Sequence, residues 1–373
     1  MRYILEARNV SYRYGGSSDA HMPLSNVSLG IREGSKTVIL GANGAGKSTL
    51  FYLFNGVFRP TEGEMFYRDI SVSYRKDHLY QLREDVAVVV QNPDEQIFSS
   101  TVEEDVAFGP MNLNLHPDIV ESKIVDSLFK VGMEDFRYRP TTQLSYGQKK
   151  RVAIAGALAM NPKVLILDEP TAGLDPQMSQ EVMELVDQLC LSGTTVVIST
   201  HDVDLAYAWA DEIHVLRCGV LIYSGEPEPF FSDRASVALA GLALPHTFSI
   251  NRSLEGIRSL PEAPFPRTGS QLLAKIAPPD AVMGTVEIIP MDDGDVPEIP
   301  EDRVVGIYGF RTRRSFRDLG LRADVYFNAV EGCCLAAMNG RDSTIYCDRA
   351  LADGIARRIR SLSGFGRAPE VIG

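Results

Sequence analysis

The sequence predicts an α/β fold, and two observations lead to this prediction. Short apolar runs bounded by turn or polar residues are typical of buried strands, and they occur at 38–40, 86–90, 164–167 and 196–198. Helix-like segments lie between these runs, for example at 48–54 and 177–190. Strands that alternate with helices favour a largely parallel sheet.

A chain of 373 residues has room for two domains or three. We expect a first domain over 1–240, a proline-rich linker over 241–300 with one strand at 285–289, and a small second α/β module over 301–373. The module's predicted strands are 304–308, 323–327 and 344–347, and its predicted helices are 313–319, 329–338 and 348–359. We expect residues 361–373 to be a frayed tail.

The composition excludes several classes of protein. Hydrophobic residues make up 45% and charged residues 23%, which excludes bulk disorder. The net charge is 37 − 49 = −12, so no nucleic-acid partner is expected. Five scattered cysteines favour a reducing compartment. Because neither a signal peptide nor a run of about 20 apolar residues is present, we expect a cytoplasmic protein that a partner holds at any membrane where it acts.

A glycine-rich loop follows the first apolar run and opens a helix. Its sequence, Gly-Ala-Asn-Gly-Ala-Gly-Lys-Ser, fits the pattern G-x-x-x-x-G-K-[ST]. Backbone N–H groups of such a loop surround phosphates, and the helix N-terminus adds a favourable dipole. We expect Lys47 to reach the β- and γ-phosphates and Ser48 to bind Mg²⁺. The predicted ATP-binding residues of this segment are Gly41, Asn43, Gly44, Ala45, Gly46, Lys47, Ser48 and Thr49.

A pair of acidic residues ends the apolar run at 164–167. We expect Asp168 to hold Mg²⁺ and Glu169 to accept a proton from the attacking water. Strands often end in acidic residues, but this pair follows a phosphate loop. The segment 144–148, Leu-Ser-Tyr-Gly-Gln, precedes an apolar helix, and Ser145 alone would be read as a helix N-cap.

In this order along the chain, the motifs resemble those of the nucleotide-binding subunit of ABC transporters over about residues 3–230. The phosphate loop matches Walker A, and the strand ending at Asp168 and Glu169 matches Walker B. Gln91 matches the Q-loop, Asp175 the D-loop and His201 the switch histidine. Ser145, Gly147 and Gln148 match the signature motif. Tyr14 aligns with the aromatic residue that stacks on adenine, with Tyr12 as the alternative.

This resemblance implies ATP and Mg²⁺ as ligands and a head-to-tail dimer, formed by two copies or by one copy and a paralogue. ATP on Lys47 of one unit would be covered by Ser145 and Gly147 of the other. Glu169 would activate water, His201 would contact the γ-phosphate, and Gln91 would contact Mg²⁺. The simpler alternatives are that His201 is only a surface residue and that Gln91 is only a strand-end residue. The first signature glycine of the family is Tyr146 here, so a required positive φ would weaken the site. We expect Tyr146 to point away from the phosphate.

Three further segments are similar to the ATPases of energy-coupling-factor importers, which would act at the cytoplasmic face of the membrane. Residues 91–98 and 102–110 resemble that family in general, and 149–156 resemble its cobalt and nickel branch. The family implies an integral T-component, whose coupling helix would lie in a groove at Ile97, Phe98 and Phe108, and a substrate-binding membrane component. Core positions are the alternative for these apolar residues. A vitamin importer, a soluble ABC protein and a catalytically inactive binding module remain competing functions.

The second module has no catalytic motif. Cys333, Cys334 and Cys347 are expected to be buried apolar residues rather than metal ligands. The basic cluster of Arg311, Arg313, Arg314 and Arg317 is expected to be a solvated helix face, with anion binding as the alternative. Residues 292–295 are expected to be a solvated loop. We expect the module to be regulatory or to stabilise a dimer.

Overall fold

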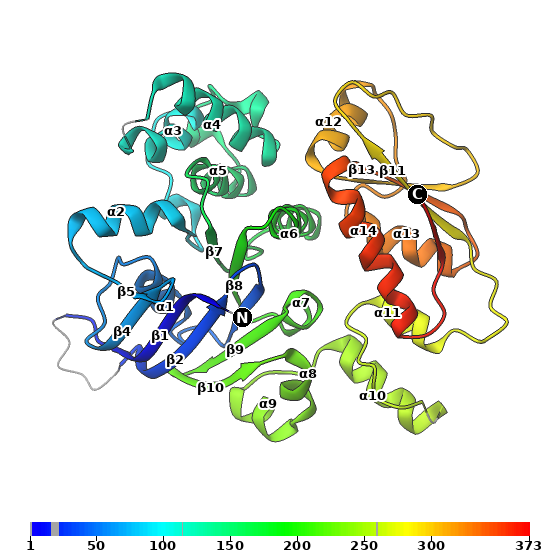
Figure 1. Ribbon diagram of the computed structural model, residues 1–373, viewed down its shortest axis with the longest axis horizontal. Helices are drawn as coiled ribbons and strands as arrows, with labels where there is room; N and C mark the ends of the chain where they lie inside the picture. The colour runs from blue at the N-terminus through cyan, green and yellow to red at the C-terminus, as the bar shows by residue number, and fades with distance from the viewer. Residues whose placement is uncertain (1, 16–21, 114, 259) are drawn as a thin grey trace. The chain divides into compact units, whose positions relative to one another are not determined.

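The structure is a computed structural model that describes residues 2–15, 22–113, 115–258 and 260–373. The chain forms two compact units, Met1–Leu244 and Pro245–Gly373 (Figure 1). The predicted first domain ended at residue 240, so the boundary differs by four residues. The predicted strands at 38–40, 86–90, 164–167 and 196–198 are all present, with ends that differ by one or two residues.

The first unit contains an antiparallel sheet of four strands in the order β2-β1-β4-β5. Its two long strands, β1 and β2, carry both buried and exposed residues, as expected where one face packs on a core. Their bounds are β1 Tyr3–Tyr12, β2 Leu24–Arg32, β4 Glu62–Tyr67 and β5 Ile70–Ser71.

A six-stranded sheet in the order β10-β9-β3-β8-β7-β6 forms the centre of the unit. Its strands are parallel except at the edge, where β10 pairs antiparallel with β9. Strands β7 and β8 are buried along their whole length, which explains why they read as unbroken apolar runs. The bounds are β3 Lys36–Leu40, β6 Val86–Val89, β7 Val164–Asp168, β8 Thr195–Thr200, β9 Glu212–Arg217 and β10 Val220–Gly225.

Helices α3, α4 and α5 pack on one another and form a helical subdomain (Figure 1). Two capping boxes begin its helices, Thr101 with Glu104 at α3 and Ser145 with Gln148 at α5. The helices of the unit are α1 Lys47–Phe54, α2 Lys76–Asp85, α3 Val102–Asn112, α4 Pro117–Lys130, α5 Tyr146–Ala159, α6 Pro176–Leu191, α7 Val203–Trp209, α8 Pro227–Ser232 and α9 Arg234–Ala240, with 3₁₀ turns at Pro93–Glu95, Glu134–Phe136 and Thr141–Gln143.

The second unit is a parallel sheet in the order β12-β13-β11-β14 with helices around it. Its strands are β11 Thr285–Met291, β12 Val304–Tyr308, β13 Ser343–Asp348 and β14 Glu370–Ile372. Its helices are α10 His246–Arg258, α11 Gly269–Ile276, α12 Phe310–Asp318, α13 Ala329–Met338 and α14 Ala352–Arg360, with 3₁₀ turns at Arg349–Leu351 and Ser361–Gly364. The α/β character predicted for this part of the chain is therefore present.

Two predictions for the second unit, at 241–300 and at 323–327, differ from the structure. The segment 241–300 contains α10, α11 and β11 and belongs mostly to the second unit, so it is not a linker. Pro290 lies in β11 beyond Thr285, Val286 and Glu287, the residues that pair with β14, on a part of the strand that β14 leaves unpaired. The predicted strand at 323–327 is reduced to one bridge between Gly306 and Val325, beside the Asp324 carboxylate, which accepts the Val305 N–H instead.

The end of the chain also differs from the expectation. Residues 361–373 are not frayed, because Leu362 is buried and β14 pairs with β11. The predicted helix at 348–359 begins as a 3₁₀ turn and becomes α14 only at Ala352. The sheet, rather than local propensity, orders this segment.

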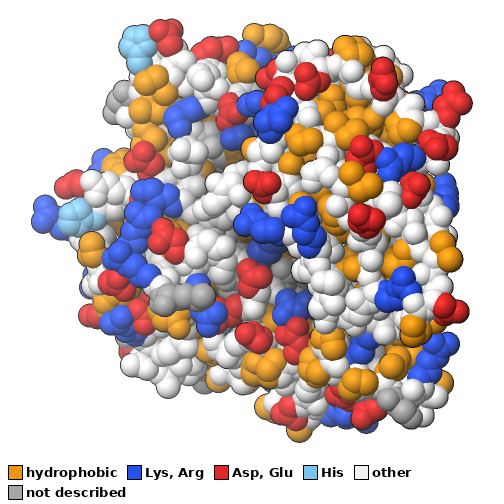
Figure 2. Space-filling model, turned by 45° about the vertical axis from the view of Figure 1, so that its right-hand side comes forward, with side chains coloured by type: hydrophobic (Ala, Val, Ile, Leu, Met, Phe, Trp, Pro, Cys, Tyr) orange, Lys and Arg blue, Asp and Glu red, His pale blue; other side chains and the backbone are white. Residues whose placement is uncertain are grey.

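The simpler interpretations of the polar clusters agree with the structure. Arg311 pairs with Asp293, and Arg314 and Arg317 pair with Asp318 on an exposed face of α12. Asp292 pairs with Arg349 at 2.7 Å. Figure 2 shows basic and acidic side chains interspersed over the face that it draws. In the described ranges, no helix is both long and apolar enough to cross a membrane.

Cys333, Cys334 and Cys347 are buried in the apolar core of the second unit, as predicted. Burial raises the pKa of each of these thiols to about 12, and the half-buried Cys190 has a pKa raised to about 12 for the same reason. Within the described residues, no cluster of three His, Cys, Asp or Glu side chains is arranged to hold a metal ion. Cys218 is exposed.

We predict that one of the five thiols reacts rapidly with a chromogenic disulfide at about pH 8, because thiolates are the reacting species and only Cys218 is exposed. The other four should react after denaturation. Absorbance stopped-flow on the folded chain measures this, with Cys218→Ser as the control that abolishes the fast phase. A second fast thiol would contradict the burial of the cysteines.

Candidate active site

The glycine-rich loop joins β3 to α1 and is held closely by the chain around it. Gly44 and Gly46 have φ values of 79° and 101°, which L side chains rarely adopt. A Cβ on Gly46 would lie 2.4 Å from the Pro23 carbonyl oxygen. Lys47 is buried, and its Nζ donates to the carbonyl of Gly41 at 2.7 Å. The loop therefore presents backbone N–H groups and a cation at the start of a helix.

A cavity of about 560 Å³ lies over this loop. Tyr14 is half-exposed at its edge, and its hydroxyl lies 2.9 Å from Thr49 Oγ1. The alternative residue, Tyr12, stacks on Phe58 at 4.9 Å and does not line the cavity. The lining consists of Tyr14, Pro23, Asn43, Gly44, Ala45, Gly46, Lys47, Ser48, Thr49, Gln91, Asp168 and Glu169. Almost all of the residues predicted to bind ATP thus share one cavity, while Gly41 lies beneath it as the acceptor of Lys47.

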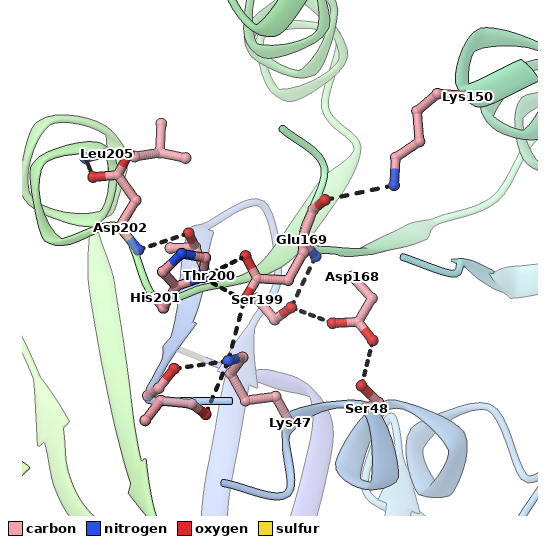
Figure 3. A network of polar contacts seen from close by, with 12 residues as sticks. Lys47, Ser48, Lys150, Asp168, Glu169, Ser199, Thr200, His201, Asp202 and Leu205 are labelled. Carbon is pink, nitrogen blue, oxygen red and sulfur yellow. Dashed lines mark hydrogen bonds and ion pairs between the residues drawn. The ribbon is translucent and has the colours of Figure 1, made fainter. Parts of the chain in front are cut away.

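Asp168, at the end of β7, binds one side chain of strand β8 and one of helix α1 at the carboxyl edge of the central sheet (Figure 3). One of its oxygens is 2.5 Å from Ser48 Oγ at the start of α1, and the other accepts from Ser199 Oγ on β8. A carboxylate and a hydroxyl placed together are hard oxygen ligands, which suit Mg²⁺. Gln91 lines the same cavity and supplies a further amide oxygen.

Glu169 lies at the centre of the polar network in Figure 3. Its carboxylate is buried and pairs with Lys47 Nζ at 3.1 Å and with His201 Nδ1 at 3.1 Å. Its backbone has φ 45°, an uncommon value for a residue with a side chain. Ser199 Oγ accepts its N–H at 3.0 Å. His201 is largely exposed, so it connects the buried glutamate to the surface.

The signature segment lies outside this cavity. Ser145 is the N-cap of α5, as its simpler interpretation predicted, and forms a capping box with Gln148. A Cβ on Gly147 would overlap the end of the Met178 side chain, which would have to move. Asp175 caps α6 by accepting the Met178 N–H. These four residues, Ser145, Gly147, Gln148 and Asp175, are therefore free of the cavity formed by their own chain.

Tyr146 is the first residue of α5 and does not have a positive φ. The condition that would have weakened the signature is therefore not met. The Tyr146 hydroxyl donates to the Gln91 carbonyl at 3.3 Å, and its ring covers Gly173.

Comparison with known proteins agrees with this geometry. Residues 24–172 match the family model for ABC transporters. The energy-coupling factor transporter ATP-binding protein EcfA2 of Methanospirillum hungatei is 38% identical over 96% of this chain and 93% of its own length. The chain belongs to this family of ATP-binding proteins of energy-coupling-factor transporters. It is therefore an ATP-binding subunit and an ATPase whose hydrolysis serves transport.

Two solved structures share the ABC ATPase fold. The structure of cbiO1 from Clostridium perfringens, part of the ABC transporter complex cbiONQ, is 37% identical, with a TM-score of 0.57 over 69% of this chain and 96% of that one. The dimeric cassette MJ0796 bound to ADP and Pi is 30% identical, with a TM-score of 0.56 over 60% of this chain and 99% of that one. The Methanospirillum relative alone of these three extends over nearly the whole chain, second unit included.

The predicted docking residues of this energy-coupling-factor ATPase lie on its helical subdomain. Phe98 and Phe108 are 65% and 49% exposed, and their rings meet edge to face with centroids 4.6 Å apart. The core alternative is therefore wrong for these two residues. Ile97 is partly buried.

Two polar residues of the site were missed from the sequence. Ser199 binds both Asp168 and the Glu169 N–H, and its position opposite Asp168 follows from the pairing of β7 with β8. Lys150 is fully buried in α5 and donates to the Gln91 carbonyl at 2.7 Å. A charged residue at a buried position of an apolar helix was the available signal.

We predict that Ser199→Ala lowers the free energy of unfolding by about 1–3 kcal/mol, because it leaves a buried carboxylate oxygen and a buried N–H without this partner. Urea unfolding followed by circular dichroism measures the change. Ser122→Ala, at an exposed position of α4, is the matched control and should change the value by less than about 0.5 kcal/mol. Equal effects of the two variants would contradict the hydrogen-bond assignment.

Proposed function

We propose that this chain hydrolyses Mg-ATP between two ATPase units and thereby drives an energy-coupling-factor importer, with cobalt or nickel as the cargo. The observation that carries the proposal is the convergence of Lys47, Ser48, Asp168 and Glu169 on one cavity at the carboxyl edge of the sheet. His201 adds a titratable group to the same network.

The proposed roles follow from the chemistry of each side chain. The loop N–H groups and Lys47 hold the phosphates, and Tyr14 stacks on adenine. Ser48, Asp168 and Gln91 hold Mg²⁺, which when bound neutralises charge on the β- and γ-phosphate oxygens. The phosphates compete with Glu169 for Lys47, since both bind the same ammonium. Release from Lys47 leaves the Glu169 carboxylate able to accept a proton from water, and His201 then contacts the γ-phosphate.

The second ATPase unit supplies the signature residues. Ser145, Gly147 and Gln148 lie at the N-terminus of α5, where N–H groups and the helix dipole favour an anion. They do not line the cavity of their own chain, which supports action on the ATP of a partner unit. Asp175 belongs to the same interface. Because Tyr146 takes an ordinary helical conformation, the argument for an inactive binding module is weakened.

The membrane partner is proposed to bind at Phe98 and Phe108. An exposed aromatic pair suits the apolar face of a helix. This contact would hold the ATPase at the cytoplasmic face of the membrane, beside a T-component and a substrate-binding component. Cobalt or nickel rests on the similarity of residues 149–156 to that branch, and a vitamin is the competing cargo. We propose a regulatory or dimer-stabilising role for the second unit.

We predict that Glu169→Gln lowers ATP turnover by about 100-fold or more, because it removes the proposed proton acceptor, while ATP binding persists. The variant should accumulate as an ATP-dependent dimer in size-exclusion chromatography with light scattering. Lys47→Ala should lose both ATP binding and turnover. Normal turnover by Lys47→Ala would refute the site, and a monomeric Glu169→Gln at saturating ATP would refute the shared-interface mechanism.

We predict that the Glu169→Gln chain, purified with detergent-solubilised native membranes, retains a small integral T-type protein and a cobalt- or nickel-binding membrane component. Mass spectrometry and metal analysis identify them. Adding Phe98→Asp should abolish this recovery, whereas Ile70→Asp, an equally exposed apolar position on β5, should not. A vitamin-binding component would change only the cargo. Ribosomes or DNA-repair proteins in place of membrane proteins would overturn the transport role of this chain.

A further inference from the structure

Lys150 is a fully buried lysine in the middle of the apolar helix α5. Its Nζ lies 2.7 Å from the Gln91 carbonyl oxygen, 3.3 Å from that of Val90 and 3.5 Å from that of Glu169. Figure 3 shows the side chain extending from α5 toward the Glu169 backbone. An ammonium has three donors and no acceptor, so three carbonyls can satisfy it.

The three carbonyls belong to two neighbouring strand ends. Strand β6 ends at Val89, which pairs with Leu167 of β7, so the residues that follow both strands leave the sheet at the same edge. Val90 and Gln91 begin one segment, and Glu169 begins the other. Lys150 therefore ties two loops of the active site to one helix.

A second contact from the same helix reinforces this connection. Tyr146, one turn before Lys150, donates its hydroxyl to the Gln91 carbonyl at 3.3 Å. The Glu169 backbone is held on both sides, by Ser199 at its N–H and by Lys150 at its carbonyl. Such support is needed because Glu169 has φ 45°, which persists only when the surroundings stabilise it.

We propose that Lys150 is a positioning residue for ATP hydrolysis, whose ammonium fixes the backbones of Gln91 and Glu169 to the signature helix and so aligns both side chains with the phosphates. This inference rests on the roles proposed above for Gln91 and Glu169. Lys150 does not line the cavity. It acts through the carbonyl groups that it binds, those of Gln91 and Glu169 above all.

The electrostatic environment agrees with a positional role. Burial lowers the pKa of Lys150 to about 8, although the carboxylates of Asp168 and Glu169 act in the opposite direction. A buried ammonium is unfavourable for stability unless its hydrogen bonds are needed. An apolar residue of similar length would avoid burying a charge, but it would leave the Val90 and Gln91 carbonyls without this donor.

The first test compares Lys150→Met and Lys150→Gln with wild type in steady-state ATP hydrolysis by the full chain. Misplacement of Gln91 and Glu169 should lower kcat by about 10- to 100-fold in Lys150→Met, with a smaller loss in Lys150→Gln, which keeps one amide donor. KM for ATP should stay within about threefold, since the phosphate loop is untouched. If Lys150 only stabilised the fold, its variants would lower the fraction of active protein, and kcat per active site would not fall further in Lys150→Met than in Lys150→Gln.

The matched control is Lys149→Met, which removes the neighbouring ammonium and its surface pair with Asp94. Its kcat should stay within about twofold of wild type. A kcat of Lys150→Met within twofold of wild type would overturn the proposal, as would an equal loss in both lysine variants.

If Lys150→Met does not fold, Lys150→Gln and Tyr146→Phe decide the question. Tyr146→Phe removes one hydroxyl from the same Gln91 carbonyl and should lower kcat by about two- to fivefold at unchanged KM. Unchanged kcat in both variants would overturn the proposal.

A double-mutant cycle tests whether Lys150 acts through Gln91. If it does, Lys150→Gln should lower kcat by less than about threefold in a Gln91→Ala background, against its larger effect in wild type. If the loss of kcat in the double variant equals the product of the losses in Lys150→Gln and Gln91→Ala, the part of the proposal that concerns Gln91 is overturned. Glu169→Gln distinguishes failure of the proposed function from failure of the Lys150 inference. Normal ATP turnover by Glu169→Gln refutes the proposed site. An inactive Glu169→Gln together with fully active Lys150 variants refutes only the inference about Lys150.

Discussion

The carboxyl end of β7 is the constraint on which the site depends. Asp168 ends a strand without an exposed residue, Glu169 follows it, and both residues are buried. Buried carboxylates require hydrogen bonds or cations, because their desolvation is otherwise unfavourable. Four side chains meet that need. Ser199 lies in the neighbouring strand β8 and His201 follows it, whereas Lys47 and Ser48 follow β3, which lies next to β8.

The order of strands explains how these partners meet. In the parallel sheet, β8 lies between β3 and β7, and β6 lies on the far side of β7. The phosphate loop follows β3, His201 follows β8, and Gln91 follows β6. Carboxyl ends of parallel strands meet at one edge, so the phosphate loop, Gln91 and the acidic pair line one cavity, and His201 pairs with Glu169 of that lining. The same geometry that satisfies the acidic pair also assembles the groups proposed to bind phosphate and to activate water.

The sequence predicted four of the six strands of this sheet, β3, β6, β7 and β8, because each is a short buried apolar run, and it predicted the site because the motifs have fixed spacing and order. It did not predict contacts that use backbone atoms. Lys150 binds carbonyls, which have the same chemistry in every residue, so only the folded chain shows which ones it meets. The order of residues 361–373 was missed for a similar reason, since β14 depends on its pairing with β11 rather than on local propensity.

Helix α5 performs two tasks at different positions along its length. Its first turn carries Ser145 and Gly147, the residues proposed to act on a partner's nucleotide, and the next turn carries Lys150, which binds Gln91 and Glu169 of its own chain. Gln91 also begins the segment that reaches the exposed Phe98. If a membrane helix binds at Phe98 as proposed, a displacement of that segment would reach α5 and the Glu169 backbone through Lys150, whose Nζ lies 2.7 Å from the Gln91 carbonyl oxygen and 3.5 Å from that of Glu169. The proposed coupling of transport to hydrolysis would then have a physical route through one lysine and these two carbonyl groups.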